Sequence, residues 1–335
     1  MTTVHPPGMK PTEAITTIDL RRTTGIRAQV LRFMPIGVLA LLIISVSVAN
    51  PNFLRPNSLL TALDSSTPLL VLAVGAMLVI LCGSIDLSVA ALASMCSVLV
   101  ALWVPALGGW AIPAAALAGA IAGCVQGLVH VIAQIPSFIV TLGGLAVWSG
   151  IGLIVSGAST IGVTGSELEW AFMRLGPARI PSAALIALAV VGVFALVLWA
   201  TPLKRWYEAI GNAEPAAAIA GVPVSALKIG AFTASGLCAG LAGGLLVART
   251  YSGAPNLADS LLLPVVAAIV VGGTAITGGY GGVGRTLIGV LIITVLRVGL
   301  SVAGVNPSYE QIVYGSLVIL AVSLTIDRSK FAFVK

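Results

Sequence analysis

Charged residues are scarce in this chain of 335 residues, in which Asp, Glu, Lys and Arg together make up 8% of the sequence. Soluble domains carry roughly a quarter, so this chain has too few charges to cover a surface that faces water. Histidine is rarer still, at two residues, which excludes a metal or catalytic cluster built on histidine. No basic patch is interleaved with aromatics, so we expect no nucleic-acid partner.

The motifs of several enzyme classes are missing as well. The chain contains no GxxxxGKS/T loop for binding the phosphates of ATP, no GxSxG and no HExxH. Its four cysteines form no CxxC pair and lie in apolar stretches, where we interpret them as small core residues. We therefore expect a chain that is not an enzyme and that holds no metal or cofactor of its own. A membrane-embedded enzyme is a disfavoured alternative.

Long apolar runs are what the chain has in abundance, with 58% hydrophobic residues and a mean hydropathy of +1.10. Runs of about 18–22 apolar residues are typical of membrane-spanning helices. The pattern predicts an all-α polytopic membrane protein with about ten transmembrane helices and interruptions in each half. The predicted membrane domain covers 33–326, between tails 1–32 and 327–335. The predicted spans are 33–50, 66–83, 87–107, 111–131, 138–156, 181–200, 227–248, 261–278, 285–303 and 311–326.

The distribution of Lys and Arg indicates the orientation. An even number of spans places both termini on one side of the membrane. With both termini inside, twelve Lys and Arg residues fall on inside segments and four on outside segments, while Arg297 lies within a span, which accounts for all 17. Because cytoplasmic loops are enriched in basic residues, we expect both tails and the loop 201–227 in the cytoplasm.

Two apolar runs repeat glycine at every fourth residue, and each repeat makes a smooth helix face that a neighbouring backbone can approach closely. Packing within one subunit is the interpretation we favour, and a dimer face is the alternative. The two triplets are Gly119, Gly123 and Gly127, and Gly236, Gly240 and Gly244.

Residues 201–228 form a polar, Ala-rich segment between two apolar spans. Asn212 is a preferred N-cap residue, and Glu214 lies in the first turn, where the helix dipole favours an acid. Gly221 fits the left-handed position that follows a helix. The pattern predicts a short cytoplasmic helix over 213–220.

Most side chains of this short helix are methyl-sized, which suits insertion into a groove of a partner because nothing bulky holds the two backbones apart. The alternative is a helix that lies on the lipid surface. Its weak apolar face argues against that alternative, since Ile219 is its only large hydrophobic residue.

A carboxylate stands between two apolar spans in the sequence GSIDLS, residues 83–88. Such a group is costly in lipid and is a candidate for function. Asp86 lies either on a translocation route or at a moving hinge, or it caps a helix that starts at Leu87. These interpretations carry similar weight, and one residue could serve both purposes.

Two further segments carry polar residues within apolar runs. Thr141 follows Pro136 in the stretch 134–144, where structural packing is favoured over a polar route. Thr274 lies in the glycine-rich stretch 272–284, which contains GxGxxG without the surrounding βαβ unit of a dinucleotide site. A sharp turn or re-entrant segment fits this stretch better. Breaks in both halves are typical of transporters built from repeats.

In this order, these motifs resemble the permease subunits of bacterial ATP-binding-cassette importers for monosaccharides, of the ribose-permease type. The resemblance covers roughly residues 50–326. The matching stretches are LVILCGSIDLSVAAL, IPSFIVTLGGL, EAIGNAEPAAAIAGVPVSALK, SGLCAGLAGGL and IVVGGTAITGGYGGVG.

The resemblance implies a membrane-spanning subunit that imports a ribose-like pentose or a related sugar by alternating access in the bacterial cytoplasmic (inner) membrane. It implies as partners a cytoplasmic ATPase that binds the ATP, an external sugar-binding protein and a second permease copy, identical or paralogous, besides the membrane lipid. The segment Glu208–Val222 matches the coupling region of the family. The residues expected to couple to the ATPase are Glu208, Gly211, Asn212, Glu214, Ala217 and Gly221.

The residues expected along the translocation route are Asp86, Ser88, Thr141 and Thr274. An ion-coupled secondary transporter of a small polar solute is the alternative function. The capped cytoplasmic helix and the scarcity of acids within the spans argue against it.

The chain also departs from the pattern of the family. Ser84 replaces the second glycine before the Ile-Asp-Leu-Ser sequence, and Leu262 and Pro264 stand where acidic residues are common. Arg285 and Arg297 replace small or amide residues. The resemblance therefore implies a route with different electrostatics, and it does not establish ribose as the solute.

Overall fold

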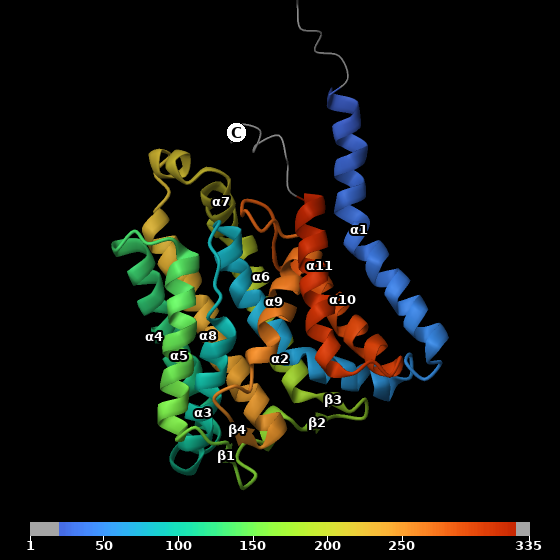
Figure 1. Ribbon diagram of the computed structural model, residues 1–335, viewed down its shortest axis with the longest axis vertical. Helices are drawn as coiled ribbons and strands as arrows, with labels where there is room; N and C mark the ends of the chain where they lie inside the picture. Colours follow the sequence, from blue (N-terminus) through green and yellow to red (C-terminus); the bar gives the residue numbers. More distant parts are fainter. Residues whose placement is uncertain (1–19, 326–335) are drawn as a thin grey trace, which may run out of the picture. The chain divides into compact units, whose positions relative to one another are not determined.

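The computed structural model describes residues 20–325 (Figure 1). The predicted tail 327–335 and residues 1–19 lie outside the described residues, whereas 20–32 belong to the first helix. The chain divides inside that helix, between Met34 and Pro35, into two units. The hydrophobic core lies in the larger unit, which begins at Pro35.

The described chain is mainly helical, in agreement with the predicted class. Its α-helices are α1 (Leu20–Ala49), α2 (Pro56–Leu81), α3 (Val89–Leu107), α4 (Ala111–Ile132), α5 (Ser137–Ser156), α6 (Ser182–Ala200), α7 (Leu203–Ile219), α8 (Val224–Thr250), α9 (Leu262–Val271), α10 (Val283–Val302) and α11 (Glu310–Thr325).

Short strands and 3-10 turns occupy the connections. Strand β1 (Ile161–Gly162) pairs antiparallel with β4 (Ser252–Gly253), and β2 (Arg174–Leu175) pairs antiparallel with β3 (Ile180–Pro181). The all-α prediction missed these pairs because strands of two residues leave no alternating pattern in a sequence. The 3-10 turns are η1 (Gly108–Trp110), η2 (Glu169–Ala171), η3 (Asp259–Leu261) and η4 (Pro307–Tyr309).

By length and composition, six stretches of the described chain are long and apolar enough to cross a membrane. One of them, Val89–Ile132, contains both α3 and α4, which η1 separates. The shorter apolar helices are Phe33–Ala49 and Asp259–Val271. The six stretches are Pro56–Leu81, Val89–Ile132, Ser137–Ser156, Ser182–Ala200, Val224–Thr250 and Val283–Val302.

The predicted span 261–278 is much longer than the helix found there. Helix α9 has ten residues, which at 1.5 Å per residue cover about 15 Å, half of a hydrocarbon core. Its C-cap is Gly272, and Gly273 adopts a left-handed backbone with φ +98°. Irregular backbone follows up to Gly282. The interruption that the sequence predicts at 272–284 is therefore present, and it shortens the preceding helix.

The glycine triplets of α4 and α8 face each other within this one chain. A Cβ atom added to Gly119 would lie 2.2 Å from the carbonyl oxygen of Gly236, and one added to Gly123 would lie 2.2 Å from that of Phe232. Only glycine allows the two backbones to come so close. The predicted packing within one subunit is confirmed.

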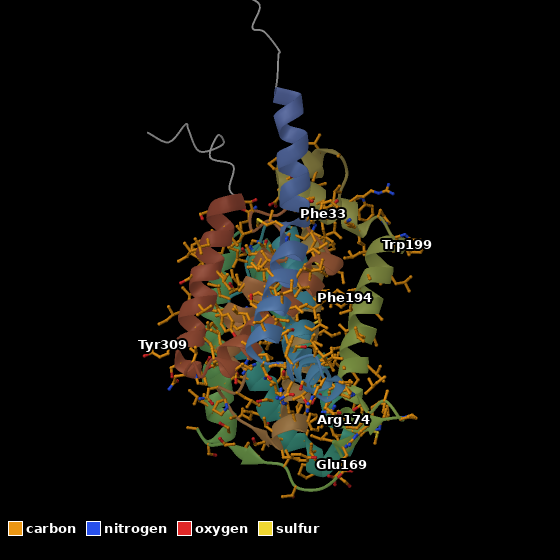
Figure 2. The ribbon with its side chains drawn as sticks, turned by 90° about the vertical axis from the view of Figure 1, so that its right-hand side faces the viewer. Phe33, Glu169, Arg174, Phe194, Trp199 and Tyr309 are labelled. Atoms are coloured by element: carbon orange, nitrogen blue, oxygen red, sulfur yellow. The ribbon has the colours of Figure 1, made fainter. Side chains whose placement is uncertain are left out.

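The connections before and after α6 lie at opposite ends of the helices. Figure 2 shows Glu169 and Arg174, which precede α6, at one end, and Trp199, near the end of α6, toward the other. Helix α7 follows α6 after Thr201 and Pro202. The cytoplasmic location of the loop 201–227 stays a prediction.

Candidate functional site

Helix α7 consists of two helical pieces. The backbone of Ala213 is extended, with φ −162° and ψ 88°, and breaks the helix between them. The helix predicted over 213–220 corresponds to the second piece, which follows Ala213 and ends at Ile219, whereas the prediction that the Asn212 side chain caps this helix is wrong. The side-chain Nδ2 of Asn212 instead donates to the carbonyl oxygens of Glu208, at 2.8 Å, and Gly279, at 3.0 Å.

The end of α7 agrees with the prediction. Gly221 has φ +81°, in the left-handed region that glycine adopts without strain. Its N–H donates to the carbonyl oxygen of Ala218 at 3.0 Å, and the N–H of Val222 donates to that of Ala217 at 3.1 Å. This pair of bonds is the Schellman arrangement, which satisfies carbonyl groups at the end of a helix.

The two faces of α7 have different surroundings. Tyr207, Ile210 and Ala217 are buried in the core, and burial raises the pKa of Tyr207 to about 12. The side chain of Ile219 is instead 90% exposed. Ala217, which was expected on the surface offered to a partner, is only 4% exposed, so that expectation is wrong. Its small size serves the packing of α7 on the rest of the chain.

Two acidic residues of α7 pair with lysines. Glu214 Oε2 lies 2.6 Å from Nζ of Lys228, a side chain that is 11% exposed, so this pair ties the second piece of α7 to the start of α8. Glu208 lies 3.8 Å from Lys204, one turn earlier on α7. The Lys204 side chain is half exposed, and such surface pairs contribute little to stability.

The first piece of α7 packs by its backbone against two other segments. A Cβ atom added to Gly211 would lie 2.2 Å from the amide nitrogen of Gly279 and 2.3 Å from the carbonyl oxygen of Leu81. These two groups are themselves joined, because the N–H of Gly279 donates to the carbonyl oxygen of Leu81 at 3.0 Å. Three separate parts of the sequence, α7, the end of α2 and the α9–α10 connection, therefore meet at Gly211.

The segment after α2 contains a buried carboxylate. Asp86 is 6% exposed, and its Oδ1 accepts from the N–H and the hydroxyl of Ser88, at 3.0 and 2.7 Å. Its Oδ2 accepts from the hydroxyl of Ser235 on α8 at 2.9 Å. Helix α3 begins at Val89, two residues later than predicted, with Ser88 as its N-cap. Asp86 thus accepts hydrogen bonds from the N-cap residue of α3 and also links the start of α3 to α8.

Comparisons with known proteins bear on this arrangement. A family model described as the permease component of a branched-chain amino acid transport system matches residues 58–322. The chain belongs to this family of transport permeases.

Relatives of this permease cover most of its length. The ribose import permease protein of Bacillus subtilis (strain 168) is 36% identical over 303 residues, which cover 88% of this chain and 92% of the relative. That of Escherichia coli (strain K12) is 34% identical over 300 residues, with 87% and 92% covered. The L-arabinose ABC transporter permease protein of Azospirillum brasilense is 31% identical over 290 residues, with 85% and 84% covered. No solved structure matches this chain.

These findings confirm the resemblance that the motifs indicated. Membership of a permease family, together with the apolar helices, also identifies a multi-pass membrane protein and a transport subunit rather than an enzyme.

The permease contains a buried polar cluster, of which Asp86, Ser88 and Thr141 were predicted as site residues and Gln126 was not. Gln126 on α4 is 4% exposed, and its Nε2 donates to the Ser88 hydroxyl at 2.8 Å. Its Oε1 accepts from Nε1 of Trp148 at 3.0 Å. The only signal for Gln126 in the sequence is that it is an amide within an apolar run. Thr141 joins the same region, since its hydroxyl donates to the carbonyl oxygen of Ile85 at 3.2 Å.

The chain has two helix breaks, one at residues 82–88 between α2 and α3 and one at 272–282 between α9 and α10. Thr274 lies in the second break and, among the described residues, shares no hydrogen bond with Asp86, Ser88 or Gln126. Its side chain is 1% exposed and packs against Gly281, where an added Cβ atom would lie 2.5 Å from Cγ2 of Thr274. Arg285 braces this break, because its Nη1 donates to the carbonyl oxygen of Gly273 at 3.3 Å and its guanidinium lies 4.3 Å from the ring centre of Tyr280. This contact gives the departure at Arg285 a structural role.

Proposed function

We propose that this permease is the membrane-spanning subunit of an ATP-driven importer that carries a monosaccharide into the cytoplasm by alternating access. A ribose-like pentose or a related sugar is the proposed solute, which the names of the ribose and L-arabinose relatives support. Its proposed partners are a cytoplasmic ATPase, an external sugar-binding protein and a second permease copy. Its proposed location is the bacterial cytoplasmic membrane, with both termini inside.

One observation carries this proposal: the backbone of α7 rests directly on both helix breaks. Gly211 has no side chain, so a displacement of α7 reaches the carbonyl group of Leu81 and the amide group of Gly279 without a flexible side chain in between. The first lies at the end of α2 and the second lies between α9 and α10. A push on α7 by the ATPase is therefore expected to move both breaks together, as alternating access requires.

The exposed face of the second piece of α7 is the proposed docking surface. Ile219 is 90% exposed at the end of this piece, and the neighbouring Ala216 and Ala218 are exposed as well. Burying a large aliphatic side chain in a partner groove contributes roughly 1.5–3 kcal/mol. In this proposal Glu214, Ala217 and Gly221 position the docking surface.

The remaining predicted residues have positioning roles in this proposal. Glu208 and Asn212 connect the first piece of α7 to the break at Gly279. Asp86, Ser88 and Thr141 hold the first break in place, and Thr274 fills space in the second. We assign these four to hinges rather than to direct contact with the solute, because Asp86 and Ser88 are occupied by their own hydrogen bonds.

The test is sugar uptake and sugar-stimulated ATP turnover in proteoliposomes that contain the permease, the ATPase and the binding protein. Ile219→Asp is expected to abolish most of both activities, because a carboxylate cannot enter an apolar groove without a large desolvation penalty. Ile219→Leu, of equal size, and Lys204→Gln, on the exposed first turn of α7, are the matched controls and should retain activity. Unchanged turnover with Ile219→Asp would contradict the docking surface. Uptake that follows an ion gradient without the ATPase would favour the secondary transporter.

A further inference from the structure

A cavity of about 160 Å³ lies between α2, η3, α9, α10 and α11, away from α7. Its lining on α2 includes Ser66, fifteen residues before Leu81, where α7 makes contact. Fifteen residues of helix span about 22 Å, so the cavity and the contact with α7 lie in different halves of α2. In the orientation that the Lys and Arg residues predict, the cavity lies in the external half of the membrane domain.

The lining of this cavity mixes apolar side chains with polar groups that are held in place by contacts with one another. Arg297 on α10 lies 3.6 Å from Glu310 on α11, measured from Nε to Oε2. The hydroxyl of Tyr314, one turn further along α11, donates to the same Oε2 at 3.1 Å. The side-chain amide of Gln311 donates to the carbonyl oxygen of Ser260 in η3 at 3.0 Å. Contacts between separate elements thus fix the positions of these polar groups.

The charges of the cavity balance. Among its described lining residues, Arg297 and Glu310 are the charged ones, and they carry opposite charges. Asp64 precedes the α2 lining residues but does not belong to the lining. A cavity without net charge favours a neutral ligand over a sugar acid or a phosphorylated sugar, because neither sign of charge would find an uncompensated partner.

The hydrogen-bonding capacity of the cavity matches a compound rich in hydroxyl groups. The side chain of Arg297 is 54% exposed, which leaves guanidinium donors free after the contact with Glu310. The carboxylate of Glu310 can accept further bonds, and so can the hydroxyl of Ser66, whose own proton is donated to the carbonyl oxygen of Leu63 at 2.8 Å. A sugar hydroxyl both donates and accepts, so neighbouring hydroxyls can bridge an Arg–Glu pair of this kind.

We infer that this cavity is an entry subsite for a neutral monosaccharide, held within a single chain by Arg297, Glu310 and the surrounding hydroxyl groups. The inference rests on the proposed function, which supplies the sugar, and adds where the permease itself recognises it. The subsite would receive the sugar before the helix breaks move, since it lies in the half of α2 that α7 does not contact.

The test uses cysteine labelling and needs no ATPase. Ser260→Cys places a thiol at the exposed rim of the cavity, and Ser308→Cys places one on an exposed turn that does not line it. The full chain in right-side-out vesicles is treated with a membrane-impermeant maleimide, with and without D-ribose, L-arabinose or D-ribonate. The unsubstituted chain, whose cysteines are buried or half-buried, gives the background.

Both thiols are expected to react from outside, with D-ribose or L-arabinose slowing the reaction only at Ser260→Cys and D-ribonate having little effect. Adding Arg297→Gln to Ser260→Cys should raise the protecting concentration roughly tenfold, the effect of losing one bond to a charged group. Labelling only after permeabilisation, no protection by either pentose, or equal protection by ribonate would overturn the inference. Sugar uptake without protection of the Ser260→Cys thiol would contradict the subsite alone. Protection of this thiol without ATP-driven sugar uptake would contradict the proposed function alone.

Discussion

The side-chain amide of Asn212 donates a hydrogen bond to the carbonyl oxygen of Gly279, 67 residues further along the chain, at 3.0 Å. This bond joins α7 to the connection between α9 and α10, where the backbone of Gly279 also donates to Leu81. A polar helix and two interruptions of apolar helices are therefore one connected structure. In the proposed function, this connection lets a segment outside the apolar spans act on segments inside them.

Replacing Gly211 by alanine should disrupt the contact of α7 with Leu81 and Gly279. The new Cβ atom would lie 2.2 Å from the nitrogen of Gly279 and 2.3 Å from the oxygen of Leu81. Both are backbone atoms that cannot rotate away, so α7 must shift, at a cost of roughly 1–3 kcal/mol. We expect sugar uptake and sugar-stimulated ATP turnover to fall several-fold in proteoliposomes, with normal membrane insertion.

Gly230→Ala is the matched control for this change. Its new Cβ atom would meet the hydroxyl of Tyr207 at 3.7 Å, an ordinary contact. If Gly211→Ala and Gly230→Ala transported sugar equally well, the contact of α7 with the two breaks would have no role in coupling.

Local patterns in the sequence predicted the features that depend on local physics. The glycine triplets of α4 and α8 give a smooth face in any helix, so their close packing could be foreseen. Gly221 ends α7 because a left-handed residue is needed there, whatever surrounds it. The break at 272–282 follows in the same way from its density of glycine.

Features that depend on a distant partner could not be predicted. Asn212 has the properties of an N-cap residue, but the carbonyl of Gly279 provides an acceptor that no local pattern reveals. Ala217 lies on a face whose burial depends on how α7 docks. The role of Gln126 could not be predicted, because only the fold brings Ser88 and Trp148 within hydrogen-bonding distance of its side chain. The cavity at Arg297 likewise combines four separate stretches of chain.

Gly236→Ala should destabilise the interface of α4 and α8. The new Cβ atom would lie 2.1 Å from the carbonyl oxygen of Gly119, so the two helices must separate. A cost of roughly 1–3 kcal/mol is expected to lower the Tm in detergent by several degrees. Gly143→Ala on α5 is the control with the opposite expectation, because no atom lies within 4 Å of its new Cβ and alanine favours helix by up to about 1 kcal/mol. Equal Tm values for the two variants would contradict the packing.

Asp86 offers a test that separates a hinge from a route. Asp86→Ala leaves the donors of Ser88 and Ser235 without their acceptor, and we expect a loss of roughly 3 kcal/mol or more together with lost uptake. Ser235→Ala should cost roughly 1.5–3 kcal/mol, because it removes a hydrogen bond to a charged group. The double variant should cost less than the sum, because the two residues share one bond. Thermal unfolding of the purified variants measures these differences.

Asp86→Asn decides between the two roles. An asparagine side chain can still accept from Ser88 through its oxygen, while its amide donates to the hydroxyl of Ser235, which can rotate to accept. The shape and the connection to α8 would then persist without the charge. If Asp86 only holds the start of α3 in place, Asp86→Asn should keep sugar uptake close to that of the unsubstituted permease. A variant with an unchanged Tm that no longer takes up sugar would show that the charge itself serves transport, and would return Asp86 to the translocation route.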